Sequence, residues 1–139
     1  MVSTGLAHAF PTPKEPPAEC YCAECGMEVK GAGKLLASEI IFKDGKVQFF
    51  CDLGDLFLYY EVLKDKSGVA AVYVHDYPSK AWVNGQTASY LSCANVKTPM
   101  GFKILAFKDK AGAEKFKKEK GGGAIYSFTE MMTSKIYKR

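Results

Sequence analysis

Positions 20 to 27 hold a concentrated set of soft sulfur donors. Cys20, Cys22 and Cys25 supply three thiols, and Met27 adds a thioether two positions later. Gly26 permits a tight turn, so the Met27 sulfur can point at the same centre as the thiols. Thiolates and thioethers select Cu(I) over Mg²⁺, Ca²⁺ or Mn²⁺, and zinc sites rarely use methionine. The segment therefore predicts a Cu(I) site.

The same cysteines allow two other interpretations. Cys22 and Cys25 have Cys-x-x-Cys spacing, which also suits a disulfide or a structural zinc site. The chain has five cysteines, so at least one is free or metal-bound even when the other four pair. A disulfide would indicate an exported protein, because the cytosol keeps thiols reduced.

Three residues elsewhere are candidates to join these thiols. Cys51 precedes a predicted helix N-terminus, which lowers the pKa of a thiol. His75 lies where a buried strand emerges, and a neutral imidazole suits copper. Met100 lies between a proline and a glycine, on a tight loop. Each has a structural alternative: a buried thiol, a hydrogen-bonded polar residue and a core methionine. The sulfur residues expected to pack in the core are Cys93, Met131 and Met132.

Composition and charge fit a folded domain that needs no disulfide staples. Of 139 residues, 47% are hydrophobic, and a chain this long buries roughly two thirds of its unfolded surface. The net charge of +4 is too small to indicate nucleic acid binding. The lysines of residues 108–120 lack interleaved aromatics that stack on bases, so we interpret them as a solvated helix face. No stretch approaches the ~18 apolar residues of a membrane span.

The first half of the chain predicts a hairpin, a helix and a buried strand. Residues 38–43 and 47–50 are strand-like, and the Asp-Gly pair between them predicts a type I′ turn. Asp52 is the expected N-cap of a helix over residues 53–63, which has one apolar face. Residues 69–74 form the buried strand.

The second half repeats this order less regularly. Its expected elements are two strands, a lysine-rich helix and a strand, at residues 88–93, 102–107, 109–120 and 124–128. A short C-terminal helix is expected to start at Thr129. We therefore predict an α+β fold of two related strand-strand-helix-strand units that share a core, at about residues 20–78 and 79–139.

Residues 1–19 are expected to lie outside this domain, as a leader or signal remnant. Residues 10–19 contain four prolines and predict an extended, polyproline-like segment. Ala7-His8-Ala9 has the small-x-small form of a signal-peptidase site, although no charged and apolar regions precede it. Glu19 lies where a lipobox needs a small residue, so no membrane anchor is evident.

In order along the chain, these motifs resemble the NosL family of copper chaperones, which serve assembly of nitrous oxide reductase. The matching pieces are Cys22-Ala23-Glu24-Cys25-Gly26-Met27, Phe50-Cys51-Asp52, Tyr73-Val74-His75-Asp76, Trp82, Ala88-Ser89-Tyr90, Met100-Gly101, and Gly122-Gly123 before a strand ending at Phe128. They span about residues 20–132. The first piece is fairly specific to the family, and the others are informative because they occur together in this order.

The resemblance implies a periplasmic protein that binds one Cu(I) and delivers it to a partner, with no catalysis of its own. It also implies a fold similar to the core of organomercury lyase. We expect a monomer whose partners donate or receive copper. The candidate metal ligands, in a subset that the sequence leaves open, are Cys22, Cys25, Met27, Cys51, His75 and Met100.

A thiol-dependent enzyme is the alternative function. Redox Cys-x-x-Cys pairs usually open a helix, whereas this pair follows a proline-rich segment and precedes Gly26. An organomercury lyase-like cleavage would need two thiols and an acid to converge. Cys25, Cys51 and Asp76 would supply them only by fold analogy.

Overall fold

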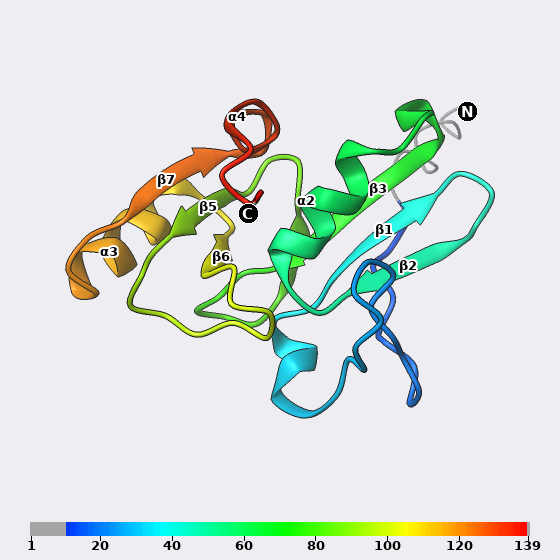
Figure 1. Cartoon of the computed structure of the whole chain (residues 1–139), viewed down its shortest axis with the longest axis horizontal. Coiled ribbons are helices and arrows are strands. Elements are labelled where there is room, and N and C mark those ends of the chain that lie inside the picture. The colour runs from blue at the N-terminus through cyan, green and yellow to red at the C-terminus, as the bar shows by residue number, and fades with distance from the viewer. Residues whose placement is uncertain (1–10, 139) are drawn as a thin grey trace, which may run out of the picture.

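Two antiparallel sheets and three α-helices form the framework in the computed structural model, which describes residues 11–138 (Figure 1). The Ala7-His8-Ala9 pattern lies outside the described residues. The strands are β1 Ser38–Phe42, β2 Val47–Phe50, β3 Val69–His75, β4 Trp82–Asn84, β5 Ser89–Ser92, β6 Ile104–Phe107 and β7 Ala124–Ser127. The helices are α2 Leu53–Glu61, α3 Lys110–Glu119 and α4 Phe128–Ser134, with short 3-10 turns η1 Gly31–Leu35 and η2 Lys66–Gly68.

Each sheet is built around a central strand in the same way. The strand orders are β2-β1-β3-β4 and β6-β5-β7, and neighbouring strands in both sheets are antiparallel. In each sheet a helix connects the second strand to the third, α2 in one and α3 in the other. The predicted α+β fold of two related strand-strand-helix-strand units is confirmed. Strand β4 extends the first sheet, although its residues follow position 78, where we expected the second unit to begin.

The hairpin between β1 and β2 forms where expected, but its turn type differs from the prediction. A type I′ turn needs positive φ at both central residues, and only Gly45 has it, at 94°. The Gly45 N–H donates to the Phe42 carbonyl at 2.9 Å, and the Phe42 N–H donates to the Lys46 carbonyl at 2.8 Å. The loop therefore has three residues, with glycine in the left-handed position of a bulge, a common alternative for Asp-Gly.

The two units share one aromatic core around helix α2. Phe57 lies 5.1 Å from Tyr90, 5.6 Å from Phe128 and 5.4 Å from Tyr137, measured between ring centroids. All three partners belong to the second half of the chain, so α2 of the first unit is packed against the second. Cys93 is buried in a smaller apolar cluster beneath α3, as expected.

The C-terminal helix begins earlier than predicted. Ser127, not Thr129, caps it: the Ser127 hydroxyl accepts the Glu130 N–H at 3.0 Å, and the Glu130 carboxylate accepts the Ser127 N–H at 2.8 Å. This reciprocal capping box satisfies two backbone donors at once, whereas a threonine at 129 would cap only one.

Residues 11–19, which we call the N-terminal strap, lie against the first sheet. The Tyr73 hydroxyl donates to the Pro11 carbonyl at 2.6 Å. The Lys14 N–H donates to both carboxylate oxygens of Glu39, at 3.0 and 3.1 Å. The Trp82 Nε1–H also donates to Glu15, at 2.7 Å. Three residues of the sheet therefore contact a segment that was expected to be a leader.

Candidate metal centre

A short loop carries Cys22 and Cys25. Cys22 N–H donates to the Met27 carbonyl at 2.8 Å, and Gly26 N–H donates to the Cys22 carbonyl at 3.0 Å. Gly26 has a φ of 80°, which glycine adopts without steric cost. The predicted tight turn is therefore present, and it is closed by the loop's own backbone.

The loop is anchored beside the end of β2. Ala23 N–H donates to the Phe49 carbonyl at 2.8 Å, and Cys51 follows β2 directly. Asp52 then caps helix α2, as predicted, by accepting the Gly54 N–H at 3.4 Å. This arrangement brings the Cys-x-x-Cys segment to the junction between β2 and α2.

Three thiols and a carboxylate meet at this junction. One ligand atom each from Cys22, Cys25, Cys51 and Asp55 lies within 4.8 Å of all the others. Cys25 Sγ is 3.4 Å from Cys51 Sγ, while Asp55 Oδ2 is 3.3 Å from Cys51 Sγ and 3.6 Å from Cys22 Sγ. Two sulfurs on one ion, each at about 2.3 Å, lie at most about 4.6 Å apart. This cysteine–aspartate cluster is therefore compact enough for a single metal ion.

Asp55 is the member of this cluster that sequence reasoning missed as a site residue. An acidic residue in the first turn of a helix already has an ordinary role there, because it opposes the positive end of the helix dipole. Cys51 lies directly before the helix cap Asp52, and Asp55 lies in the first turn of α2, where its Oδ2 is 3.3 Å from Cys51 Sγ. The sequence signal for this pair is the Cys-x-x-x-Asp spacing across the N-terminus of the helix.

The cluster concentrates negative charge at Cys22. The Cys51 thiol donates toward Cys22, and backbone N–H groups of Cys25 and Cys51 add to this, so the pKa of Cys22 falls to about 5. Burial raises the pKa of Cys25 to about 11. Burial and the nearby Cys22 charge raise the pKa of Asp55 to about 6. At neutral pH one thiolate is ready to bind a cation, and the remaining thiols must lose protons when the metal binds.

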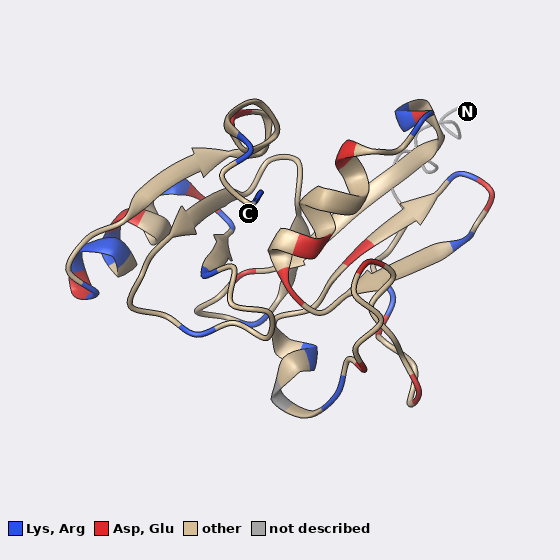
Figure 2. Ribbon diagram, viewed as in Figure 1, with Lys and Arg blue, Asp and Glu red and all other residues tan. Residues whose placement is uncertain are grey.

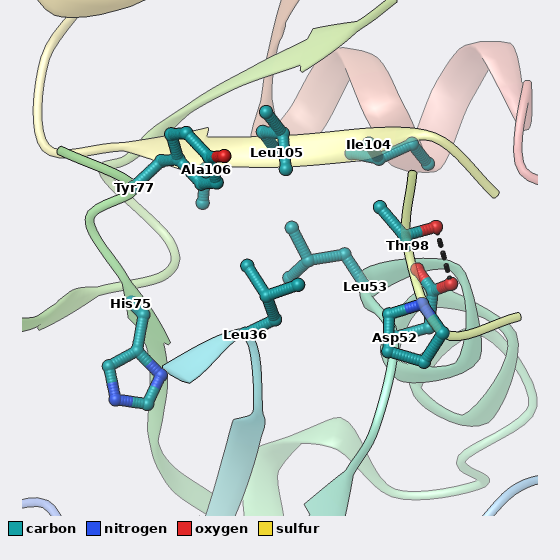
Figure 3. Close-up of a pocket in the computed structure, with 10 residues that line it drawn as sticks. Leu36, Asp52, Leu53, His75, Tyr77, Thr98, Ile104, Leu105 and Ala106 are labelled. Carbon is teal, nitrogen blue, oxygen red and sulfur yellow. Dashed lines mark hydrogen bonds between the residues drawn. The ribbon is translucent and has the colours of Figure 1, made fainter. Parts of the chain in front are cut away.

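Met100 is held close to this junction through its backbone. Asp52 Oδ2 accepts the Met100 N–H at 2.8 Å. It also accepts the Thr98 hydroxyl at 2.7 Å (Figure 3). Asp52 is the neighbour of Cys51, and the Met100 side chain packs against the same core as the cysteines. Met27, on the cysteine loop itself, is 55% exposed.

His75 has other partners and is not part of the cluster. Its Nδ1 lies 2.8 Å from the Ala37 carbonyl oxygen, and its ring stacks on Trp82 with centroids 3.8 Å apart. Burial lowers its pKa. In Figure 3 the ring points away from a cavity of about 10 Å³, at the opposite end from Asp52. A cavity of that size holds at most one water molecule.

Asp76, the acid considered for a lyase-like site, serves a turn instead. Its carboxylate accepts the Ser79 hydroxyl at 2.6 Å and the Lys108 N–H at 2.8 Å. It is likewise absent from the cysteine–aspartate cluster. The Asp76 carboxylate therefore caps the turn at Ser79.

The family model for NosL matches residues 13–136, nearly all of the described chain. The chain belongs to the NosL family. The crystal structure of the copper chaperone NosL from Shewanella denitrificans is similar to it, with a TM-score of 0.74 and 27% sequence identity over 88% of this chain and 97% of that one. No curated protein sequence matches. The resemblance inferred from the ordered motifs is thereby confirmed.

Two further observations describe this NosL-family protein. Within residues 11–138, no helix is both long and apolar enough to cross a membrane. The lysine-rich helix α3 lies at the far end of the molecule from the cysteine loop (Figures 1 and 2). The positive charge of α3 is therefore remote from the candidate metal centre.

Proposed function

We propose that this protein is a periplasmic Cu(I) chaperone that delivers copper to a cuproenzyme during assembly of nitrous oxide reductase. One observation carries the copper part: three cysteine sulfurs from two separate segments lie within the reach of one ion. Membership of the NosL family and the likeness to a copper chaperone support the same proposal.

The donors match Cu(I) as cargo. Thiolates are its preferred ligands, and two or three of them suffice. Cys22 offers a thiolate at neutral pH, and Cys25 and Cys51 complete a three-sulfur set as their protons leave. Asp55 is a hard oxygen donor, so its role is to accept the hydrogen bond of the Cys51 thiol in the metal-free protein and hold that sulfur in place.

The different solvent exposures of the three sulfurs suit both retention and transfer of copper. Cys22 and Cys51 are each 3% exposed, whereas Cys25 is partly exposed. A partner with soft ligands can therefore reach the copper at Cys25 while the two buried sulfurs still hold it. Met27, exposed on the same loop, offers a thioether on the side from which the partner approaches.

The experiment is an anaerobic titration of reduced protein with Cu(I) against a chromogenic chelator. We expect one Cu(I) per chain, and at least tenfold weaker binding for each of Cys22→Ser, Cys25→Ser and Cys51→Ser. Cys93→Ser, in the core beneath α3, is the matched control and should bind normally. Absence of binding by reduced wild-type protein would refute the proposal. Transfer from the loaded protein to copper-free nitrous oxide reductase tests the client, and cell fractionation tests the compartment.

A second candidate function has one specific observation in its favour. Organomercury cleavage needs thiols to take the mercury and an acid to protonate the carbon as the carbon–mercury bond breaks. The cluster supplies this combination with Asp55 in the place we had considered for Asp76. Release of the hydrocarbon from an organomercurial by wild-type protein, and its loss in Asp55→Asn, would favour the enzyme over the chaperone.

A further inference from the structure

Two of the three thiols in the cluster are already in contact. Cys25 Sγ and Cys51 Sγ are 3.4 Å apart, and a disulfide bond measures about 2.0 Å, so an approach of about 1.4 Å joins them. The bond would connect the cysteine loop to the end of β2, which the Ala23–Phe49 hydrogen bond already holds together. A small movement of the loop is therefore sufficient.

Sequence spacing alone favours a different pair, Cys22 with Cys25. The structure turns Cys22 inward: its Sγ accepts the Cys25 N–H at 3.4 Å and lies 3.6 Å from Asp55 Oδ2. Cys25 instead directs its sulfur across the gap to Cys51. Cys25 is also the most exposed thiol of the cluster, so it is the one that a dissolved oxidant reaches.

We propose that Cys25 and Cys51 form a reversible disulfide in the copper-free protein, by exchange with a low-molecular-weight disulfide, and that this bond closes the metal centre. The Cys25 thiol loses its proton, and the resulting thiolate attacks one sulfur of the oxidant, forms a mixed disulfide and releases one low-molecular-weight thiol, which takes up that proton. Cys51 then attacks Cys25 Sγ, forms the internal bond and releases the second thiol. The protein loses two electrons and two protons, and both appear in the two released thiols.

The consequence for copper rests on the proposed function, whereas the disulfide itself does not. After oxidation, Cys22 is the one cluster thiol left, and a single thiol beside a carboxylate holds Cu(I) poorly. Bound copper, in turn, occupies the sulfur electron pairs with which Cys25 and Cys51 attack. Loading therefore requires a thiol reductant, and the loaded site resists the oxidant.

Three pairings are possible among the cluster thiols, and tryptic digestion of wild type and of the single cysteine variants distinguishes them. Cys22 and Cys25 share the tryptic peptide of residues 15–30, while Cys51 lies in the peptide of residues 47–64. Reduced, copper-free protein is treated with oxidised glutathione, alkylated, digested and analysed by mass spectrometry. We expect the two peptides to be cross-linked in wild type, Cys20→Ser, Cys22→Ser and Cys93→Ser. We expect no cross-link in Cys25→Ser or Cys51→Ser, with Cys51→Ala as a second variant in case the serine is poorly tolerated.

The outcomes separate this inference from the proposed function. A bond within peptide 15–30, or no bond in folded wild-type protein, would overturn the disulfide even if copper binding is normal. Addition of Cu(I) before the oxidant should slow cross-linking at least tenfold. If the cross-link forms equally fast with copper present, the inferred protection fails, and so does the assignment of Cys25 and Cys51 as copper ligands, while the disulfide stands.

Discussion

Glu39 gives the protein a stability that depends on pH. This carboxyl lies fully buried in β1, and both its oxygens accept the Lys14 N–H of the N-terminal strap. Burial raises its pKa from 4.5 to about 7, with a further rise from the negative charge of Glu15. We predict that Glu39→Gln, which keeps an acceptor for Lys14 but cannot ionise, removes this pH dependence.

The direction and the magnitude of the stability change follow from the pKa of Glu39 in the folded protein and in the unfolded chain. The folded protein binds the Glu39 proton more tightly than the unfolded chain does, so its contribution is complete below about pH 4.5 and is lost as the pH rises through about 7. The gap of about 2.5 pH units corresponds to roughly 3 kcal/mol, at about 1.4 kcal/mol for each unit. Wild type should lose about that much stability relative to Glu39→Gln between pH 4.5 and 8.

Urea unfolding of reduced protein, followed by Trp82 fluorescence at several pH values, measures this difference. Other titrating groups, including Asp55, contribute equally to both proteins and cancel. Glu114→Gln, an exposed change on α3, is the control and should follow wild type at every pH. If the stability of wild type and Glu39→Gln differs by the same amount across the whole range, Glu39 does not titrate in the strap's contact and the reasoning is refuted.

Three shorter predictions concern Met100, His75 and Gly54. Met100→Leu should cost under about 1.5 kcal/mol in stability but weaken Cu(I) binding in the chelator titration; unchanged affinity would mean that the thiol cluster binds alone. His75→Ala should lower the melting temperature through the lost Trp82 and Ala37 contacts while leaving Cu(I) affinity at pH 7.5 within about twofold, and a tenfold loss of affinity would make His75 a ligand. Gly54→Ala should destabilise by about 1–3 kcal/mol because the new Cβ would lie 2.0 Å from the Phe102 ring; denaturant unfolding that matches wild type would contradict that packing.

Local signals in the sequence predicted most of the fold. The Asp-Gly hairpin, the Asp52 cap and the repeated order of elements each depend on neighbours within a few residues. The errors were local too: of the Asp44-Gly45 pair in the hairpin turn, only Gly45 takes positive φ. Ser127 with Glu130 caps α4 better than Thr129 does. These are competitions between two plausible turns or caps, which differ by little in free energy.

Contacts between distant segments were beyond the sequence patterns. The strap was interpreted as a leader because its prolines exclude regular structure, yet Lys14 and Glu39 meet across 25 positions. His75 emerges from a buried strand as predicted, but its partner at Ala37 and its stacking on Trp82 follow from strand pairing. A pattern within one segment carries no information about which of several segments it will face.

The metal centre shows how local sequence patterns and contacts between distant segments each contribute to function. A Cys-x-x-Cys pair alone is compatible with a disulfide, a zinc site or a copper site, and the sequence left all three open. The fold adds Cys51 and Asp55 from a second segment, and it places the three sulfurs at different depths. Two buried sulfurs and one accessible sulfur can retain an ion during exchange, which a solitary surface pair does less well. The same third thiol gives Cys25 a partner for oxidation other than Cys22, so the feature that favours copper transfer also makes the site sensitive to redox conditions.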